Sequence, residues 1–151
     1  ITHVPFRGAG PMLVEVVAGR LESGCDNMPS CIGHIRDGRL RALAVTSNVR
    51  AAALPDVPTL AEAGIRDFEA TAWFGVQAPS RTPRPIIERL GAEIDVITRD
   101  PAYIARIAEL GGAPPALTPA GGSSPESFDA FIRSEITKWA EVVKVSGATV
   151  D

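Results

Sequence analysis

The sequence has little of what marks several functional classes. Aromatic residues make up only 5% of its 151 residues, and 15 Lys and Arg stand against 18 Asp and Glu, a formal net charge of −3. A chain with no basic excess and few stacking side chains is a poor partner for nucleic acid or an anionic membrane surface. No apolar run reaches the roughly 18 residues that a membrane-spanning helix needs. We therefore expect no nucleic-acid partner and no direct membrane insertion.

Cysteine and histidine are equally scarce. The chain has 2 Cys and 2 His, and the positions of Cys25, Cys31, His3 and His34 do not supply the spacing of a zinc site. A disulfide between the cysteines in an oxidising compartment and two small apolar fillers are both open interpretations. We predict no bound metal.

Catalytic motifs are also missing. There is no G-x-S-x-G elbow and no lysine after a glycine-rich phosphate loop. His3 and His34 have no partner serine or carboxylate in a suitable place, so we interpret both as structural. The sequence predicts neither an enzyme nor a bound cofactor. The remaining composition, 45% hydrophobic and 22% charged, is that of a globular chain able to bury a core.

The most informative stretch is residues 2–11, an extended run that ends in glycines before a helix. Gly8 and Gly10 permit a tight turn, and Pro11 suits the first position of a helix. The unpaired N–H groups of such a helix start favour a carboxylate or phosphate. Arg7 adds a donor fork in front of it, although a solvated surface charge is the alternative.

The rest of the first half alternates extended and helical segments, which is typical of a parallel, helix-covered sheet. A second helix begins near Pro29 and ends at Gly38, with Asp26 or Asn27 as its cap. Residues 59–62 read as a capping box that opens a short turn. Strands are expected at residues 2–6, 21–26 and 40–46, and we expect the last of them to be buried on both faces. The first helix is expected at residues 12–18, buried and ended by Gly19.

The second half is mainly helical. Apolar residues recur at spacings of three and four in a helix capped by Thr82, in one capped by Asp100, and in a long helix from Pro125. We interpret the Ile and Phe stripe of the last helix as core packing. Composition changes near Trp73, so we expect three parts: 1–71, a crossing at 72–78, and 79–151.

Five blocks in a fixed order resemble the Bug receptors, the substrate-binding proteins of tripartite tricarboxylate transporters. The last helix fits as well, through residues 131–139 (FIRSEITKW). Phe6 departs from the tyrosine that is common in the family. The blocks are residues 3–11 (HVPFRGAGP), 25–30 (CDNMPS), 34–46 (HIRDGRLRALAVT), 54–64 (LPDVPTLAEAG) and 71–75 (TAWFG).

The resemblance implies an α/β fold of the periplasmic binding protein type II-like class. Residues 1–71 would be the α/β portion of the second lobe, and 79–151 the helical return to the first lobe. It also implies a periplasmic receptor about twice this length that closes on a small organic carboxylate and meets membrane transporter subunits. A half-cleft should bind poorly, and its uncovered helices could self-associate.

Under this resemblance the cleft is lined by residues from the two helix starts and the crossing. Helix capping is the alternative role for Asn27, and packing at the hinge is the alternative for Trp73. A subdomain of an α/β enzyme acting on an acyl or phosphorylated substrate is the alternative function. The expected ligand contacts are Phe6, Arg7, Gly8, Ala9, Gly10, Asp26, Asn27, Ser30 and Trp73.

Overall fold

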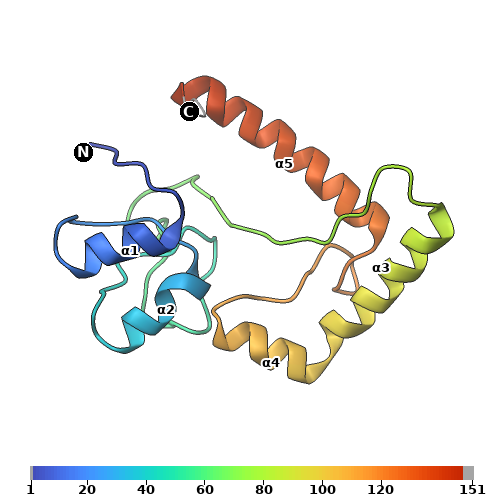
Figure 1. Cartoon of the computed structure of the whole chain (residues 1–151), viewed down its shortest axis with the longest axis horizontal. Helices are drawn as coiled ribbons and strands as arrows, with labels where there is room; N and C mark the ends of the chain where they lie inside the picture. The colour runs from blue at the N-terminus through green and yellow to red at the C-terminus, as the bar shows by residue number, and fades with distance from the viewer. Residues whose placement is uncertain (1, 148–151) are drawn as a thin grey trace. The chain divides into compact units, whose positions relative to one another are not determined.

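The structure, a computed structural model, describes residues 2–147. The described residues form two compact units. The first consists of the chain up to Gly75 together with Ala105–Ala113, and the second of Val76–Ile104 and the chain from Pro114 onward. In chain order the helices of Figure 1 are α1 (Ala9–Val17), α2 (Met28–Arg36), α3 (Arg84–Arg99), α4 (Pro101–Glu109) and α5 (Pro125–Ser146).

Helix α1 begins earlier than the sequence indicated. Gly8 is its N-cap at φ 104°, a backbone conformation that only glycine adopts without strain. Pro11 is therefore the third helical residue, and its assignment to the first position was wrong. The end of the helix is as expected, because Gly19 has a φ of 70° just beyond the C-cap Ala18.

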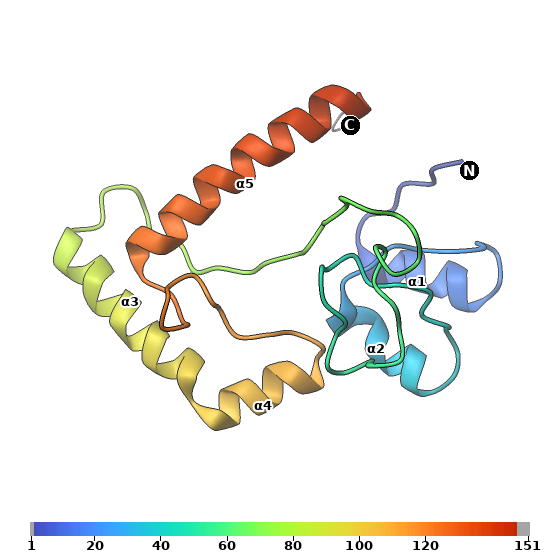
Figure 2. The same ribbon diagram turned by 180° about the vertical axis from the view of Figure 1, so that it is seen from behind.

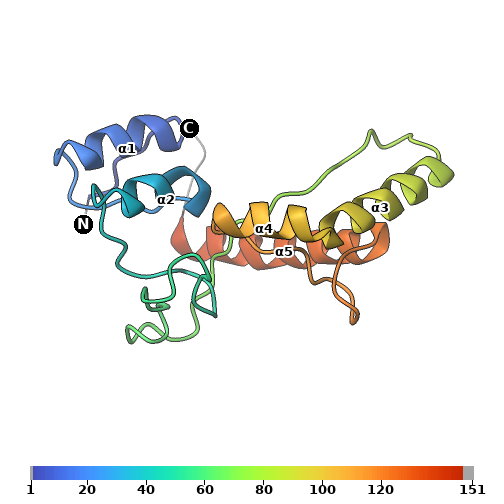
Figure 3. The same ribbon diagram turned by 90° about the horizontal axis from the view of Figure 1, so that it is seen from below.

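Helix α2 follows its expected bounds closely. Asn27 is the N-cap, and Gly38 has a φ of 71° after the C-cap Asp37. The Asn27 side chain, however, makes no capping hydrogen bond to the helix. Helices α1 and α2 contact each other and lie side by side in the first unit (Figures 1 and 3).

The expected strands do not form a sheet within the described residues. Residues 2–6, 21–26 and 40–44 follow irregular or extended paths, and the only pairing near them is one parallel bridge between Val45 and Thr59. Leu43 is 64% exposed, so the expectation of a strand buried on both faces was also wrong. A strand needs a neighbour in register to complete its hydrogen bonds, and these segments have none in the described chain.

A capping box orders the turn that follows the Val45 bridge. The Thr59 amide donates to Glu62 Oε2 at 2.8 Å, and the Glu62 amide donates to Thr59 Oγ1 at 3.1 Å, as the sequence predicts. Arg50 donates from Nε to the same carboxylate at 2.9 Å. This hydrogen bond, helped by the Thr59 amide, lowers the pKa of Glu62 below its ordinary value.

Helix caps define the second unit. Asp100 Oδ1 accepts hydrogen bonds from the amides of Ala102 and Tyr103, which confirms its cap of α4. Ser124 and Ser127 form a reciprocal capping box at the start of α5. The cap expected at Thr82 was wrong, because the N-cap of α3 is Pro83 and α3 has no side-chain cap.

A charged pair on α3 holds the loop before α5. Asp95 accepts from the Ser123 amide at 2.9 Å and from Arg99 Nε at 2.8 Å. Arg99 in turn donates to the carbonyl oxygens of Ala120 and Gly121 at 3.1 and 2.5 Å. The hydrogen bond from Arg99, and to a smaller extent the one from the Ser123 amide, lowers the pKa of Asp95 below its ordinary value. Figure 2 shows this loop in orange beside α3.

We expect Gly122→Ala to loosen this loop. Gly122 has a φ of 77°, and a Cβ there would overlap Asp95 Oδ1 and Arg99 Nη2. Gly121 has a similar φ of 74° but open space around it, so Gly121→Ala is the matched control for backbone strain alone. By urea denaturation Gly122→Ala should cost about 0.5–1 kcal/mol more than Gly121→Ala, because the Asp95 and Arg99 side chains must move aside and lose hydrogen bonds to the loop. Equal costs would contradict the role assigned to the pair.

The core is small, and it lies in the first unit. Among the described hydrophobic residues only Leu13 and Ile32 are buried, at 7% and 5% exposure. Helix α5 buries no residue, and Ile136 on its apolar stripe is 64% exposed. The interpretation of that stripe as core packing is therefore wrong for this chain. The burial expected of α1 holds for Leu13 alone.

Candidate functional site

The turn into α1 presents unpaired backbone donors. The N-cap residue of α1 is Gly8, so no side-chain hydrogen bond caps the helix, and its first turn carries no acidic residue. The N–H groups at a helix start have no partner within the helix, so they can donate to an external anion. Phe6 is half-buried before this turn and Arg7 is exposed. The local structure thus has the donors that the sequence led us to expect.

The start of α2 differs because its polar side chains bind one another. Ser30 Oγ donates to the carbonyl oxygen of Asn27 at 3.1 Å and approaches Asp26 Oδ1 at 3.4 Å. Asp26 Oδ2 is buried and has no hydrogen-bond partner. An ionised Asp26 would repel an anion here, so a neutral hydroxyl or amide contact suits this helix start better than a carboxylate.

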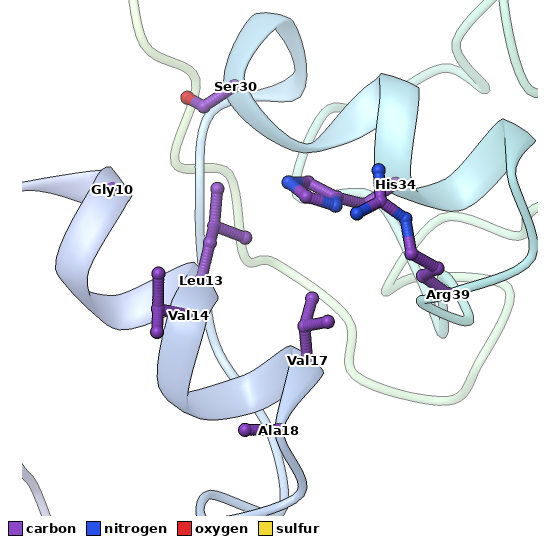
Figure 4. A pocket seen from close by; sticks show the side chains of 8 residues that line it. All are labelled: Gly10, Leu13, Val14, Val17, Ala18, Ser30, His34 and Arg39. Carbon is purple, nitrogen blue, oxygen red and sulfur yellow. The ribbon is translucent and has the colours of Figure 1, made fainter.

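A hollow of about 510 Å³ joins the two helices of the first unit (Figure 4). It brings together Gly10 and Ser30 from the expected ligand contacts. Other expected ligand contacts do not line it, namely Phe6, Arg7, Asp26, Asn27 and Trp73. Trp73 is 40% exposed elsewhere in the first unit. The lining residues are Gly10, Leu13, Val14, Val17, Ala18, Ser30, His34 and Arg39.

Two of the polar lining residues were missed by the sequence analysis. His34 was interpreted as structural, yet its Nδ1 atom is buried with no hydrogen-bond partner. Arg39 was not considered, although its backbone amide donates to the His34 carbonyl oxygen at 2.9 Å. A usable signal existed, because Ser30 and His34 stand four residues apart and so share one face of α2.

The cysteines form no disulfide in this structure. Cys25 is exposed, so its interpretation as an apolar filler was wrong. Cys31 Sγ donates to the Asn27 carbonyl oxygen at 3.6 Å. Burial, with a smaller effect of the Asp26 charge, raises the pKa of the Cys31 thiol. A thiol held protonated is a weak nucleophile.

Two other kinds of site are absent from residues 2–147. No group of three or more His, Cys, Asp and Glu side chains there could hold a metal ion. No described helix has the length and apolar content to cross a membrane. The candidate site therefore rests on backbone donors and on the polar groups of α1 and α2.

Comparison with known proteins identifies the family. Residues 1–147 match the tripartite tricarboxylate transporter family receptor. The chain belongs to this family. The protein BugT of Bordetella pertussis is 38% identical over 148 residues, which cover 98% of this chain and 44% of BugT. A UPF0065 protein from the TAR-I ttuE-ttuC' intergenic region of Agrobacterium vitis is 37% identical over 147 residues, covering 97% and 42%.

Solved structures with similar sequences share the fold. R. palustris Rpa4515 with adipate has a TM-score of 0.87 at 34% identity, covering 97% of this chain and 47% of that one. MatC from Rhodopseudomonas palustris with bound malate has a TM-score of 0.79 at 33% identity, covering 93% and 47%. The periplasmic binding protein BugD has a TM-score of 0.82 at 30% identity, covering 95% and 47%.

These matches confirm the expected fold class, a partial α/β fold of the periplasmic binding protein type II-like class. The chain spans less than half the length of BugT, the Agrobacterium vitis protein, Rpa4515 and MatC. The absence of strand pairing among the described residues does not alter the class of fold. Family members are solute receptors, and no comparison favours the alternative of an enzyme subdomain.

Proposed function

We propose that this chain is part of an extracytoplasmic receptor that binds a small organic carboxylate for a tripartite tricarboxylate-type transporter. The observation that carries the proposal is the start of α1, where Gly8 leaves helix N–H groups uncapped and no acidic side chain competes for them. Relatives with bound adipate and malate support a carboxylate as the ligand. The periplasm is the proposed location and the membrane subunits of the transporter are the proposed partners.

In this proposal the carboxylate lies against the α1 start. Gly8, Ala9 and Gly10 supply backbone donors. Arg7 is exposed and can add a guanidinium donor without losing a buried partner. Phe6 and Trp73 are proposed as apolar walls, and Asp26, Asn27 and Ser30 as contacts to the polar part of the ligand that is not ionised. Residues 1–71 are proposed as second-lobe residues, 72–78 as the crossing, and 79–151 as the return to the first lobe.

A charge placed inside the first turn of α1 tests the proposal. Pro11 is exposed at the third position of α1, where Pro11→Glu adds a carboxylate beside the N–H groups and Pro11→Gln adds a neutral side chain of the same shape. Because the new carboxylate is attracted to the same helix end as the ligand, Pro11→Glu should weaken malate and adipate binding roughly tenfold relative to Pro11→Gln. Neither variant should unfold α1.

The measurement is an NMR titration with malate, adipate and a neutral diamide at millimolar concentrations, which detects weak binding. Mass analysis of the recovered ligand should show unchanged malate and adipate, as a receptor requires. Equal affinities in the two Pro11 variants would place the carboxylate away from α1. Conversion of the ligand would instead favour the enzyme alternative.

A further inference from the structure

The residues that follow α4 pack on the start of α2. Residues 105–113 belong to the same unit as α2, and Figures 1 and 2 show the end of α4 beside the start of α2. The Gly112 amide donates to the Ile107 carbonyl oxygen at 2.9 Å, which together with Gly111 at φ 78° makes a Schellman motif. The end of α4 is therefore held in place by its own backbone hydrogen bonds.

Gly111 makes room for the side chain of Met28, the first residue of α2. A Cβ built at Gly111 would overlap Met28 Sδ and Cγ, and it would lie 3.1 Å from Met28 Cβ. Met28 is half-buried at this contact. Any side chain at position 111 must therefore displace Met28. Because the Cβ of Met28 is bonded directly to its backbone, the displacement reaches the start of α2 as well as the tip of the thioether.

The start of α2 needs such a contact because it has no side-chain cap. Asn27 is the N-cap residue, but its side chain makes no capping hydrogen bond. Ser30 Oγ donates to the Asn27 carbonyl oxygen at 3.1 Å, so these two residues are linked. Met28 lies between them in the chain. The contact of Met28 with Gly111 therefore sets where both polar side chains lie.

Asn27 and Ser30 can distinguish acids by a hydroxyl group. In the proposed receptor these two residues contact the part of the ligand that is not ionised. Malate carries a hydroxyl group between its two carboxylates, whereas only methylene groups join the carboxylates of adipate. An amide and a serine hydroxyl can each donate to a ligand hydroxyl or accept from it. One such hydrogen bond is typically worth a factor of roughly 3–10 in affinity.

We propose that Gly111 and Met28 are a positioning pair that gives the proposed carboxylate site its selectivity for hydroxyl-bearing acids. The missing Cβ of Gly111 admits Met28, and Met28 fixes the start of α2. Asn27 and Ser30 are thereby placed to bond the ligand hydroxyl, while neither member of the pair touches the ligand. This inference rests on the proposed receptor function and adds the residues that set its selectivity.

Gly111→Ala tests the pair through the ratio of malate affinity to adipate affinity. In NMR titrations of the 151-residue chain this ratio should fall roughly fivefold, because only malate loses a hydrogen bond. A purely structural role would weaken both acids alike. Gly38→Ala is the matched control, since Gly38 follows α2 in the same motif at φ 71° with nothing within 4 Å of an added Cβ. It adds similar backbone strain and should leave the ratio unchanged.

Met28→Ala removes the other member of the pair without straining the backbone. It should lower the ratio to the same extent as Gly111→Ala. The double variant should lower the ratio no further, because all three variants break one contact. In each of them the backbone amide signals of Asn27 and Ser30 should shift in the absence of ligand. If Gly111→Ala does not fold, the ratio in Met28→Ala decides.

An unchanged ratio in the folded variants, or additive effects in the double variant, would overturn the positioning role. An equal fall of the ratio in Gly38→Ala would also overturn it, because backbone strain alone would then explain the effect. Failure of the receptor proposal looks different, since the wild-type chain would bind neither malate nor adipate. In that case the selectivity assigned to the pair fails with it.

Discussion

At micromolar concentration the 151-residue chain is expected to sediment well above its monomer mass of 15.9 kDa. The reason is the apolar stripe of α5, where Ile136, Trp139 and Val143 recur at helical spacing and are 64%, 38% and 49% exposed. Apolar surface of this extent is rarely left in water by a stable monomer. We therefore expect association through α5. When the chain is dilute and does not associate, we expect the folded monomer to be only marginally stable.

Charge placed on the stripe should reverse this association. Ile136→Lys with Val143→Lys puts two charges on the apolar face, whereas Ser134→Lys with Thr137→Lys adds the same charge at polar, exposed positions of α5. Sedimentation velocity across a concentration series should shift toward the monomer for the first pair only, because only that pair disrupts an apolar contact. A wild-type chain that remains a stable monomer at these concentrations would show the stripe to be tolerated in water.

The exposed stripe also bears on the proposed architecture. BugT, the Agrobacterium vitis protein and Rpa4515 are each more than twice as long as the part that this chain matches. A helix face with this periodicity is typical of a helix that packs on other structure. We propose that in a receptor of that length the α5 face is covered by polypeptide that this chain does not match, and self-association of the chain would use the same face.

The helices could be predicted from local signals, because those signals act within a few residues. Asp100 caps α4 and Gly38 follows α2 as expected, and α5 starts at Pro125. The errors were one or two positions in size, as at Pro11 and Thr82. The strand pairing could not be predicted in this way. Residues 40–46 have the composition of a strand, but a ladder depends on which segments lie beside it.

Only the local features of the candidate site could be predicted, for the same reason. The Gly8 turn is a local feature, and the structure has it. Gly10 and Ser30 line one hollow because of the way α1 packs against α2. This packing cannot be predicted from a pattern of residues. His34 was set aside because the search was for catalytic partners. Its orphaned Nδ1 became visible only once burial and hydrogen bonds were known.

The second large effect is expected from truncating the core. Leu13→Ala should lower the free energy of unfolding of the first unit by about 2–4 kcal/mol, since Leu13 is 7% exposed and the removal of its methyl groups would leave a cavity. That loss is a large fraction of the roughly 5–15 kcal/mol that typically holds a domain folded. Leu13 and Ile32 are the only buried hydrophobic residues among those described, so no larger core can absorb the change.

The adjacent Val14 supplies the control, because it is on the same helix and 60% exposed. Val14→Ala should change the free energy of unfolding by no more than about 0.5 kcal/mol, as expected for an exposed position. Leu13→Ala and Val14→Ala are each introduced into the α5 double-lysine variant, which is expected to be monomeric, and the two proteins are compared by urea denaturation followed by circular dichroism. If Leu13→Ala costs no more than Val14→Ala, then the contact between α1 and α2 does not hold the first unit together. In that case its stability must come from the capped turns around Thr59 instead.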